Sequence, residues 1–141
     1  MSKDLADKAI NIKGKQYVQV ADRILYFNEQ YKEGCITTDL VRYENKQIII
    51  ACKAYPEGLT GRYFSGYAQE IEGEGYINKT SALENAETSA VGRALAMMGI
   101  GVIDSIASID EINKANNRPK TPTEPPKDES KPQNLGDDEI P

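Results

Sequence analysis

The stretch TSALENAETSAVGRALAMMGIG, residues 80–101, decides how this chain folds. Apolar residues recur along it at helical spacing, which predicts one long helix with an apolar stripe. The stripe comprises Leu83, Ala86, Ala90, Val91, Ala94, Leu95, Met97 and Met98. Ser81 and Glu84 match a capping box at its start, and Gly99 supplies the left-handed residue at its end. Most of the stability of such a helix comes from packing its stripe against another layer.

The other side of this helix carries small residues, where a solvated face would carry Lys and Glu. These residues are Asn85, Thr88, Ser89, Gly92 and Ala96. Such a face indicates close approach by another element, and we favour the first helix or a second subunit over a nucleic-acid backbone. Arg93 is the only cation at the border of this face, suited to a salt bridge or to a phosphate contact. Glu87 projects near the apolar stripe and needs a partner there.

The residues before this helix predict an earlier helix and three strands. Val20, Ile24, Phe27 and Tyr31 have helical spacing, and Gly34 follows them. The strand-like runs are CITTDLVRY (35–43), QIIIACKAY (47–55) and RYFSGYAQEI (62–71). Connections of three and six residues between these runs predict an antiparallel meander.

The expected fold class is therefore α+β: a helix, a three-stranded antiparallel meander, a long helix packed on one sheet face, and a disordered C-terminal tail. We divide the chain into an N-terminal arm (1–12), a folded domain (13–113), a disordered Pro-rich linker (114–134) and an acidic tip (135–141). No run approaches the roughly 20 apolar residues of a membrane span, and the N-terminus lacks the apolar centre of a secretory signal. We expect a cytoplasmic protein without membrane contact.

The residue types argue against several kinds of chemistry. The chain has no His and only two cysteines, Cys35 and Cys52, so we expect no metal, no cofactor and no catalytic residue. The net charge of −5 argues against nucleic-acid binding, but the charge is unevenly distributed. Residues 13–63 contain eight Lys and Arg against six Asp and Glu, and residues 64–115 contain three against eight. An acidic total thus conceals a locally basic surface.

The predicted sheet has one face that the long helix leaves open. Strand alternation directs several tyrosines and a lysine to that face and puts other cations at the strand ends. With Arg93, the candidate binding residues are Arg42, Tyr43, Lys46, Lys53, Tyr55, Arg62, Tyr63 and Tyr67. Rings and cations together suit single-stranded nucleic acid, since each base offers a π face and each phosphate a charge. The alternative is that they are ordinary strand and edge residues.

Glu70, Glu72 and Glu74 follow one another at alternate positions after the third run. We expect a solvated acidic turn. The alternative is a Mg²⁺ site, which would make the protein a small metal-dependent nuclease.

The order helix, meander and ALENAETSAVGRALAMMGIG resembles phage single-strand-annealing proteins of the essential-recombination-function type and, more distantly, the annealing core of eukaryotic Rad-type recombination mediators. The lead KGKQYVQVADRILYFNE is similar too, and the resemblance covers residues 12–112. It implies single-stranded-DNA binding between sheet and helix, strand annealing in phage or mobile-element replication and recombination, and assembly into homo-oligomers. Arg93 matches the arginine of the helix motif. Annealing proteins have a richly basic groove, and this chain offers few cations there. Plain single-strand binding without annealing is therefore a second expectation.

The acidic tip resembles the C-terminal tip of bacterial single-stranded-DNA-binding proteins, which docks replication and repair enzymes. The matching residues, without the terminal Phe of that family, are Asp137, Asp138, Glu139, Ile140 and Pro141. The alternative for the tail is a solubilising acidic segment. Three alternatives apply to the whole protein. A five-stranded OB barrel would bind single strands with a different fold. A small metal-dependent nuclease or a structural oligomer without ligand would have a different function.

Overall fold

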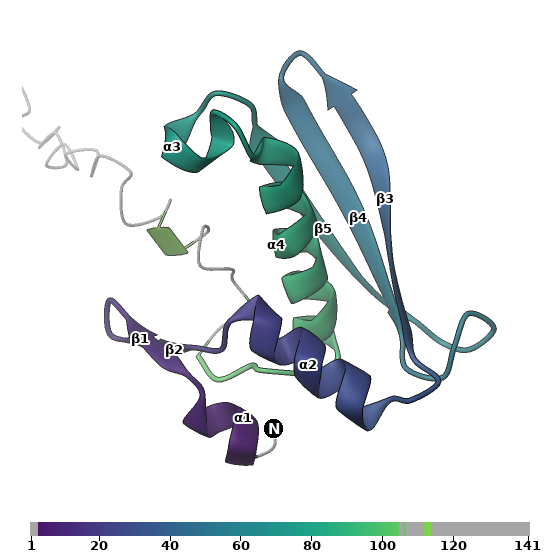
Figure 1. Ribbon diagram of the computed structural model, residues 1–141. Helices are drawn as coiled ribbons and strands as arrows, with labels where there is room; N and C mark the ends of the chain where they lie inside the picture. The colour runs from purple at the N-terminus through teal and green to yellow at the C-terminus, as the bar shows by residue number, and fades with distance from the viewer. Residues whose placement is uncertain (1–2, 105, 107–111, 114–141) are drawn as a thin grey trace, which may run out of the picture.

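The computed structural model describes residues 3–104, 106, 112 and 113 and shows an α+β fold (Figure 1). Its helices are α1 (Lys3–Asp7), α2 (Val20–Gln30), α3 (Gly75–Asn78) and α4 (Ala82–Met97). Its strands are β1 (Ile10–Ile12), β2 (Lys15–Tyr17), β3 (Cys35–Glu44), β4 (Gln47–Tyr55) and β5 (Phe64–Ile71). β1 and β2 form a two-stranded hairpin, and β3–β4–β5 form the predicted three-stranded antiparallel meander. The predicted fold class is confirmed, and the arrangement is not an OB barrel.

The predicted linker and acidic tip lie outside the described residues, and so do the five candidate partner-binding residues at the end of the chain. Within the described part, no helix combines the length and the apolar character needed to cross a membrane.

The sheet buries one face against α4. Ile48, Ile50, Cys52 and Ala54 alternate along β4 and are all buried, as predicted. On β5 the matching position opposite Cys52 is Gly66. A Cβ at Gly66 would lie 2.4 Å from the backbone oxygen of Ala90 and 2.4 Å from the backbone nitrogen of Ala94, so the helix backbone lies directly on this glycine. Close contact between α4 and β5 therefore depends on the absence of a side chain at Gly66.

The small-residue side of α4 packs against α2. Ser89, Gly92 and Ala96 are buried, and a Cβ at Gly92 would lie 2.7 Å from Cγ2 of Val20. The side chain of Arg23, which is 1% exposed, crosses the same contact and donates from its NH1 nitrogen to the Gly92 carbonyl at 3.1 Å. Packing against the helix predicted at residues 20–31, one of the two favoured explanations, is thus confirmed around Gly92, whereas Thr88 is exposed.

Two details of α4 differ from the prediction, and a third agrees with it. Leu83 and Met97 are 40% and 56% exposed, so the buried stripe is narrower than predicted and consists mainly of alanines. Ser81 occupies the N-cap position, but its side chain makes no capping hydrogen bond, so the predicted capping box does not form. Glu87 does find a partner, because the Thr38 hydroxyl donates to its Oε2 at 2.8 Å.

The N-terminal residues form structure that the sequence reasoning did not foresee. α1 contributes Leu5 to the core, and the boundary drawn between residues 12 and 13 falls at the turn between the paired strands β1 and β2. The turn residues Lys13 and Gly14 both have positive φ, 50° and 87°. This is the geometry of a two-residue type I′ hairpin turn.

Burial of Cys52 predicts a pH-dependent loss of stability. Burial, and then the charge of Glu87, raise the pKa of this thiol from 9.0 to about 12. The native thiol therefore keeps its proton above pH 9 while the unfolded thiol loses it, so the stabilisation is present below pH 9 and is lost as pH rises toward 12. Between pH 8 and pH 10 we expect the wild type to lose about 1.4 kcal/mol more free energy of unfolding than Cys52→Ala. Urea unfolding at both pH values measures this difference, and equal losses would contradict it.

Candidate nucleic-acid interface

The open face of the sheet brings together four of the predicted residues, Lys53, Tyr55, Tyr63 and Tyr67, which we call the tyrosine face. The rings of Tyr55 and Tyr63 have centroids 5.3 Å apart, and Lys53 Nζ lies 4.9 Å from the Tyr63 centroid. Tyr67 pairs with Ala51 in the β4–β5 ladder. Tyr63 and Tyr67 are 51% and 60% exposed, so both rings are available to a ligand.

Strand pairing explains why these side chains share a side. Lys53 pairs with Thr37 on β3 and with Ser65 on β5, and neighbours across a ladder point to the same face. Because Cys52 and Ala54 point to α4, Lys53 and Tyr55 must point away from it. Asp39 pairs with Ala51 and adds one carboxylate to this side of the sheet. The face is thus rich in aromatic rings and poor in net charge.

Two further candidates, Arg42 and Lys46, lie at the other end of the meander. Lys46 sits in the β3–β4 turn with φ of 66° and is exposed. Arg42 pairs with Ile49 on the open side, but its Nε lies 3.7 Å from Glu44 Oε2 and its NH1 donates to Gln47 Oε1 at 3.3 Å. Part of the charge of Arg42 is therefore compensated.

Tyr43 is a correction, because it lies on the helix side of the sheet. The strand register shifts between Leu40 and Arg42, so that Tyr43 pairs with the buried Ile48. One extra residue in a bulge reverses the side to which every later residue points. The Tyr43 hydroxyl donates to Glu72 Oε2, and this hydrogen bond is the largest of the causes that raise its pKa.

Arg62 and Arg93 also lie apart from the tyrosine face. The guanidinium of Arg62 lies 4.7 Å from the Phe64 centroid, and Phe64 shares the helix side with its partner Ala54. Arg93 belongs to α4, whose backbone covers Gly66 on the helix side of β5. The motif arginine and Lys53 thus belong to opposite sides of the sheet.

The three glutamates predicted as an acidic turn, Glu70 within β5 and Glu72 and Glu74 after it, do not share one environment. Glu70 is buried and accepts from Asn78 Nδ2 at 2.6 Å, which corrects the expectation that this whole segment is a solvated turn. Asn85 Nδ2 of α4 donates in turn to Asn78 Oδ1 at 3.2 Å, so the network joins β5, α3 and α4. Among the described residues, no three side chains of metal-ligating type gather at one place. The nuclease alternative finds no support in this part of the chain.

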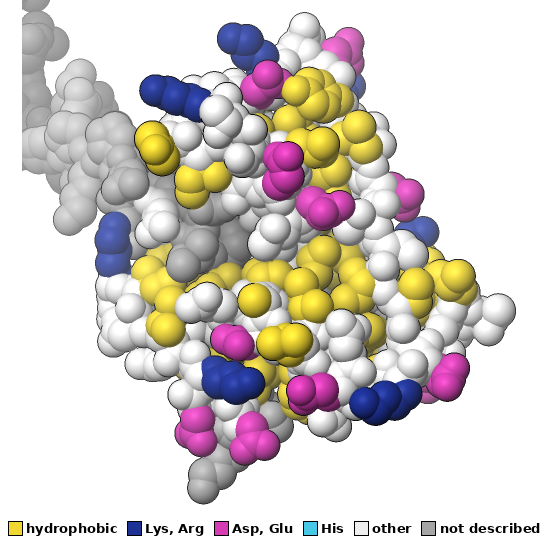
Figure 2. All heavy atoms as spheres, viewed as in Figure 1, with side chains coloured by type: hydrophobic (Ala, Val, Ile, Leu, Met, Phe, Trp, Pro, Cys, Tyr) yellow, Lys and Arg dark blue, Asp and Glu magenta, His cyan; other side chains and the backbone are white. Residues whose placement is uncertain are grey.

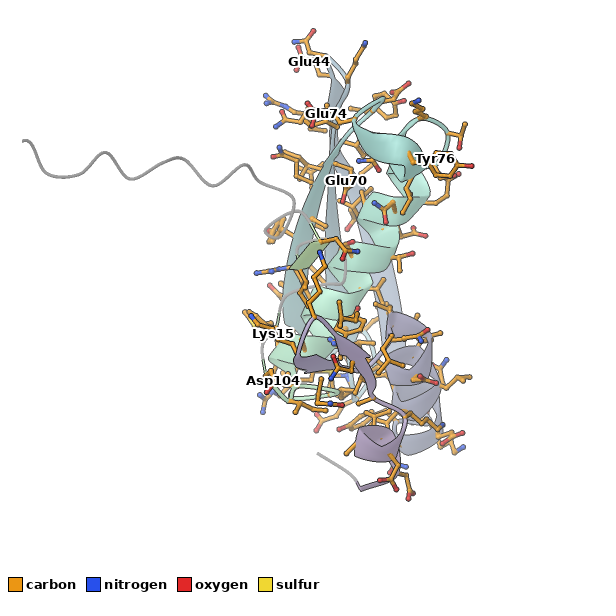
Figure 3. The ribbon with its side chains drawn as sticks, turned by 90° about the vertical axis from the view of Figure 1, so that its left-hand side faces the viewer. Lys15, Glu44, Glu70, Glu74, Tyr76 and Asp104 are labelled. Carbon is orange, nitrogen blue, oxygen red and sulfur yellow. The ribbon has the colours of Figure 1, made fainter. Side chains whose placement is uncertain are left out.

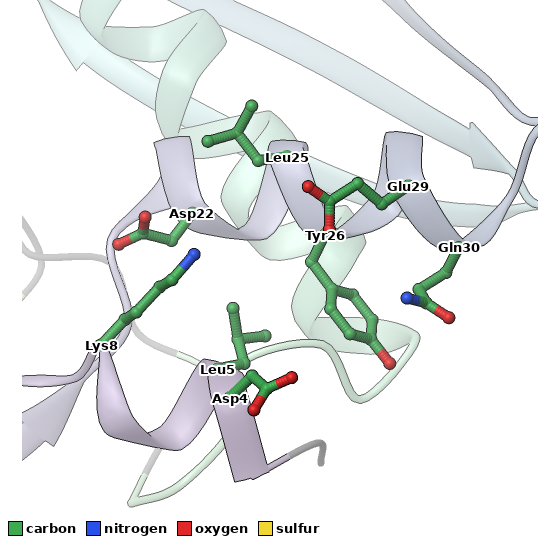
Figure 4. A pocket seen from close by; sticks show the side chains of 8 residues that line it. All are labelled: Asp4, Leu5, Lys8, Asp22, Leu25, Tyr26, Glu29 and Gln30. Carbon is green, nitrogen blue, oxygen red and sulfur yellow. The ribbon is translucent and has the colours of Figure 1, made fainter.

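The helix side of the domain carries charges of both signs. Its acidic side chains include Asp22 and Glu29 on α2 and Glu84 and Glu87 on α4, its basic ones include Arg62 and Arg93, and Figure 2 shows side chains of both signs among hydrophobic ones on this face. A hollow between α1 and α2 is likewise lined by charged and hydrophobic side chains (Figure 4). The residues that line it are Asp4, Leu5, Lys8, Asp22, Leu25, Tyr26, Glu29 and Gln30. With Asp4, Asp22 and Glu29 against the single Lys8, the hollow repels phosphates rather than attracting them.

Two lysines that the sequence reasoning did not select as candidates stand at the tip of the β1–β2 hairpin. Lys13 and Lys15 are exposed on either side of Gly14. The available signal was the short Lys-Gly turn between the β-type triplets INI and KQY.

Comparison with known families finds a family model that matches the central part of the chain. The model of the family described as Slr1353 N-terminal dsRNA-binding domain-like matches residues 24–98, more than half of the 141 residues. The match begins within α2, includes β3, β4 and β5, and ends just after α4, so α1 and the β1–β2 hairpin lie outside it. No curated protein matches the chain. The chain belongs to the Slr1353 N-terminal dsRNA-binding domain-like family.

Proposed function

We propose that this domain binds single-stranded DNA on the tyrosine face and acts without catalysis. The observation that carries the proposal is the group of Tyr55, Tyr63 and Lys53, with ring centroids 5.3 Å apart and a cation 4.9 Å from one of them, on a sheet face opposite α4. Unpaired bases expose π faces that stack on such rings, whereas a duplex hides them. Phage or mobile-element recombination, with strand annealing, is the setting that the resemblance to annealing proteins implies.

Duplex RNA is the second candidate, and the family description favours it. Double-stranded-RNA-binding domains contact phosphates and 2′-hydroxyls over about 16 base pairs, so they need several cations on one side. On the helix side, Asp22, Glu29, Glu84 and Glu87 offset the charges of Arg62 and Arg93. The open side offers Lys53 in the tyrosine face, with Arg42 and Lys46 at one end of it. The distribution of charge therefore favours the single-stranded ligand.

A binding assay with four ligands of equal length decides between these candidates. Single- and double-stranded DNA and RNA are titrated with the full chain over a range of salt concentrations. We expect tighter binding to single-stranded DNA than to either duplex, and a weak salt dependence. The slope of log K against log salt should correspond to only a few phosphates, at about −0.7 for each phosphate on a single strand. Tighter binding to duplex RNA would establish the second candidate instead, and absence of binding to all four ligands would overturn both.

A further inference from the structure

The β1–β2 hairpin is a paired element that the family match leaves out. Ile10 pairs with Tyr17 and Ile12 with Lys15. The turn is held from within, because the Gly14 amide donates to Asn11 Oδ1 at 2.9 Å. The side chain of Asn11 therefore stabilises the turn that carries Lys13 and Lys15.

The base of the hairpin is tied to the core. Tyr17 is 5% exposed, and its ring lies 5.2 Å from the guanidinium carbon of the buried Arg23. Arg23 Nε donates to the carbonyl of Val18 at 2.9 Å, and the Gln16 amide donates to Asp104 Oδ2 at 2.6 Å. The hairpin is thus joined both to α2 and to the segment after α4. Figure 3 views the domain from this side, with Lys15 and Asp104 close together beside α4.

The charge of the hairpin differs from that of its surroundings. Residues 8–17 contain three lysines, Lys8, Lys13 and Lys15, and no Asp or Glu. Arg42 and Glu44 form an ion pair, but neither Lys13 nor Lys15 pairs with any described carboxylate. The carboxylate of Asp104 accepts from the Gln16 backbone instead. Two exposed cations on this turn, neither in an ion pair with a described residue, suit a polyanion.

The position of the hairpin connects it with the sheet. In Figure 1 it lies beside α4, on the side of the domain away from β3, and its contacts with Arg23 of α2 and with Asp104 place it in the helix layer rather than on the open face. Tyr63, just before β5, and Tyr67, within it, belong to the tyrosine face, so a strand that crosses the sheet toward β5 and passes round that edge enters the helix layer, where the hairpin lies. The tyrosine face itself supplies one lysine, Lys53, which leaves the phosphates beyond the sheet without a cation on the open side.

We propose that Lys13 and Lys15 form a second phosphate contact, which holds a single strand where it leaves the tyrosine face over the β5 edge. This inference rests on the proposed function. It makes the nucleic-acid site longer than the part of the chain that matches the family, and it assigns the hairpin to the phosphate backbone while the sheet takes the bases.

The test compares two double variants with equal changes of charge. Lys13→Asn with Lys15→Gln removes the hairpin cations and keeps the turn, because asparagine before Gly14 is preferred in a type I′ turn. Lys32→Gln with Lys79→Gln removes two exposed lysines from the loops before β3 and before α4. We expect the hairpin variant to reduce the magnitude of the single-strand salt slope by about 1.4, from two contacts at about 0.7 each, and the control to leave the slope unchanged.

Ligand length gives an independent readout. In a series from about 4 to 16 nucleotides, the shortest strands should bind the wild type and the hairpin variant alike, and the two proteins should diverge as the strand becomes long enough to reach the hairpin. A hairpin variant with the wild-type slope at every length would overturn the inference and leave the proposed function standing. Equal reductions in both double variants would overturn it too, because they would show a general charge effect. Failure of the wild type to bind single strands would instead overturn the proposed function.

Discussion

Gly66→Leu is expected to separate α4 from the sheet and to unfold most of the protein at 37 °C. Even Gly66→Ala puts a Cβ 2.4 Å from backbone atoms of Ala90 and Ala94, and helix backbone cannot move aside as a flexible side chain can. Overpacking of a core costs about 1–3 kcal/mol and occasionally more. We expect Gly66→Ala to reach the upper end of that range, which corresponds to a fall in Tm of more than about 10 °C for a domain of this size.

The control for this prediction is Gly61→Ala. A Cβ at Gly61 would meet the Glu57 side chain at 3.2 Å, and that side chain is exposed and free to turn away. Thermal unfolding followed by circular dichroism should show a change of less than about 0.5 kcal/mol for this variant. If Gly66→Ala matched Gly61→Ala in Tm, the close contact between α4 and β5 would be disproved.

The two-sided packing of α4 explains the composition that made its sequence distinctive. Gly66 of β5 lies against one side of the helix, and Val20 with the buried Arg23 lies against the other. Only small residues such as Gly92 allow a neighbouring element to come so close on both sides. The pattern of small residues was therefore sufficient to predict that the helix is covered on both sides, but it left the first helix and a second subunit open, and only the contacts of Val20 and Arg23 show that α2 is the covering element.

Other features depend on interactions that no local pattern reveals. The side of Tyr43 follows from the bulge between Leu40 and Arg42, and strict alternation predicts the opposite side. Burial of Glu70 depends on Asn78, which lies on the following helix and supplies the hydrogen bond. The hairpin rests on a contact with Asp104, which is 88 residues away from Gln16 in the sequence, and on a contact with Arg23 of the next helix. Strands as short as β1 and β2 carry too few residues for periodicity to show.

Replacing Tyr63 or Tyr67 by alanine should weaken single-strand binding strongly without affecting the fold. Stacking of a base on an aromatic side chain is worth about 1–3 kcal/mol, which predicts a loss of about 5- to 150-fold in affinity for each variant. Because both rings are more than half exposed, at 51% and 60%, we expect the Tm to change little. The salt slope should stay near that of the wild type, because the variants remove stacking and leave the phosphate contacts in place.

Tyr76→Ala is the matched control for the loss of a tyrosine. Tyr76 is 90% exposed on α3, which follows β5, whereas Tyr63 precedes that strand, and Figure 3 shows Tyr76 at the end of the domain opposite Lys15. Tyr63→Phe adds a second control, because phenylalanine keeps the π face and loses only the hydroxyl. Fluorescence anisotropy with a labelled single strand should give near wild-type affinity for both controls and weak binding for Tyr63→Ala and Tyr67→Ala. Equal losses in all four variants would place the strand elsewhere, and a large loss in Tyr63→Phe would show that a hydrogen bond rather than stacking holds the base.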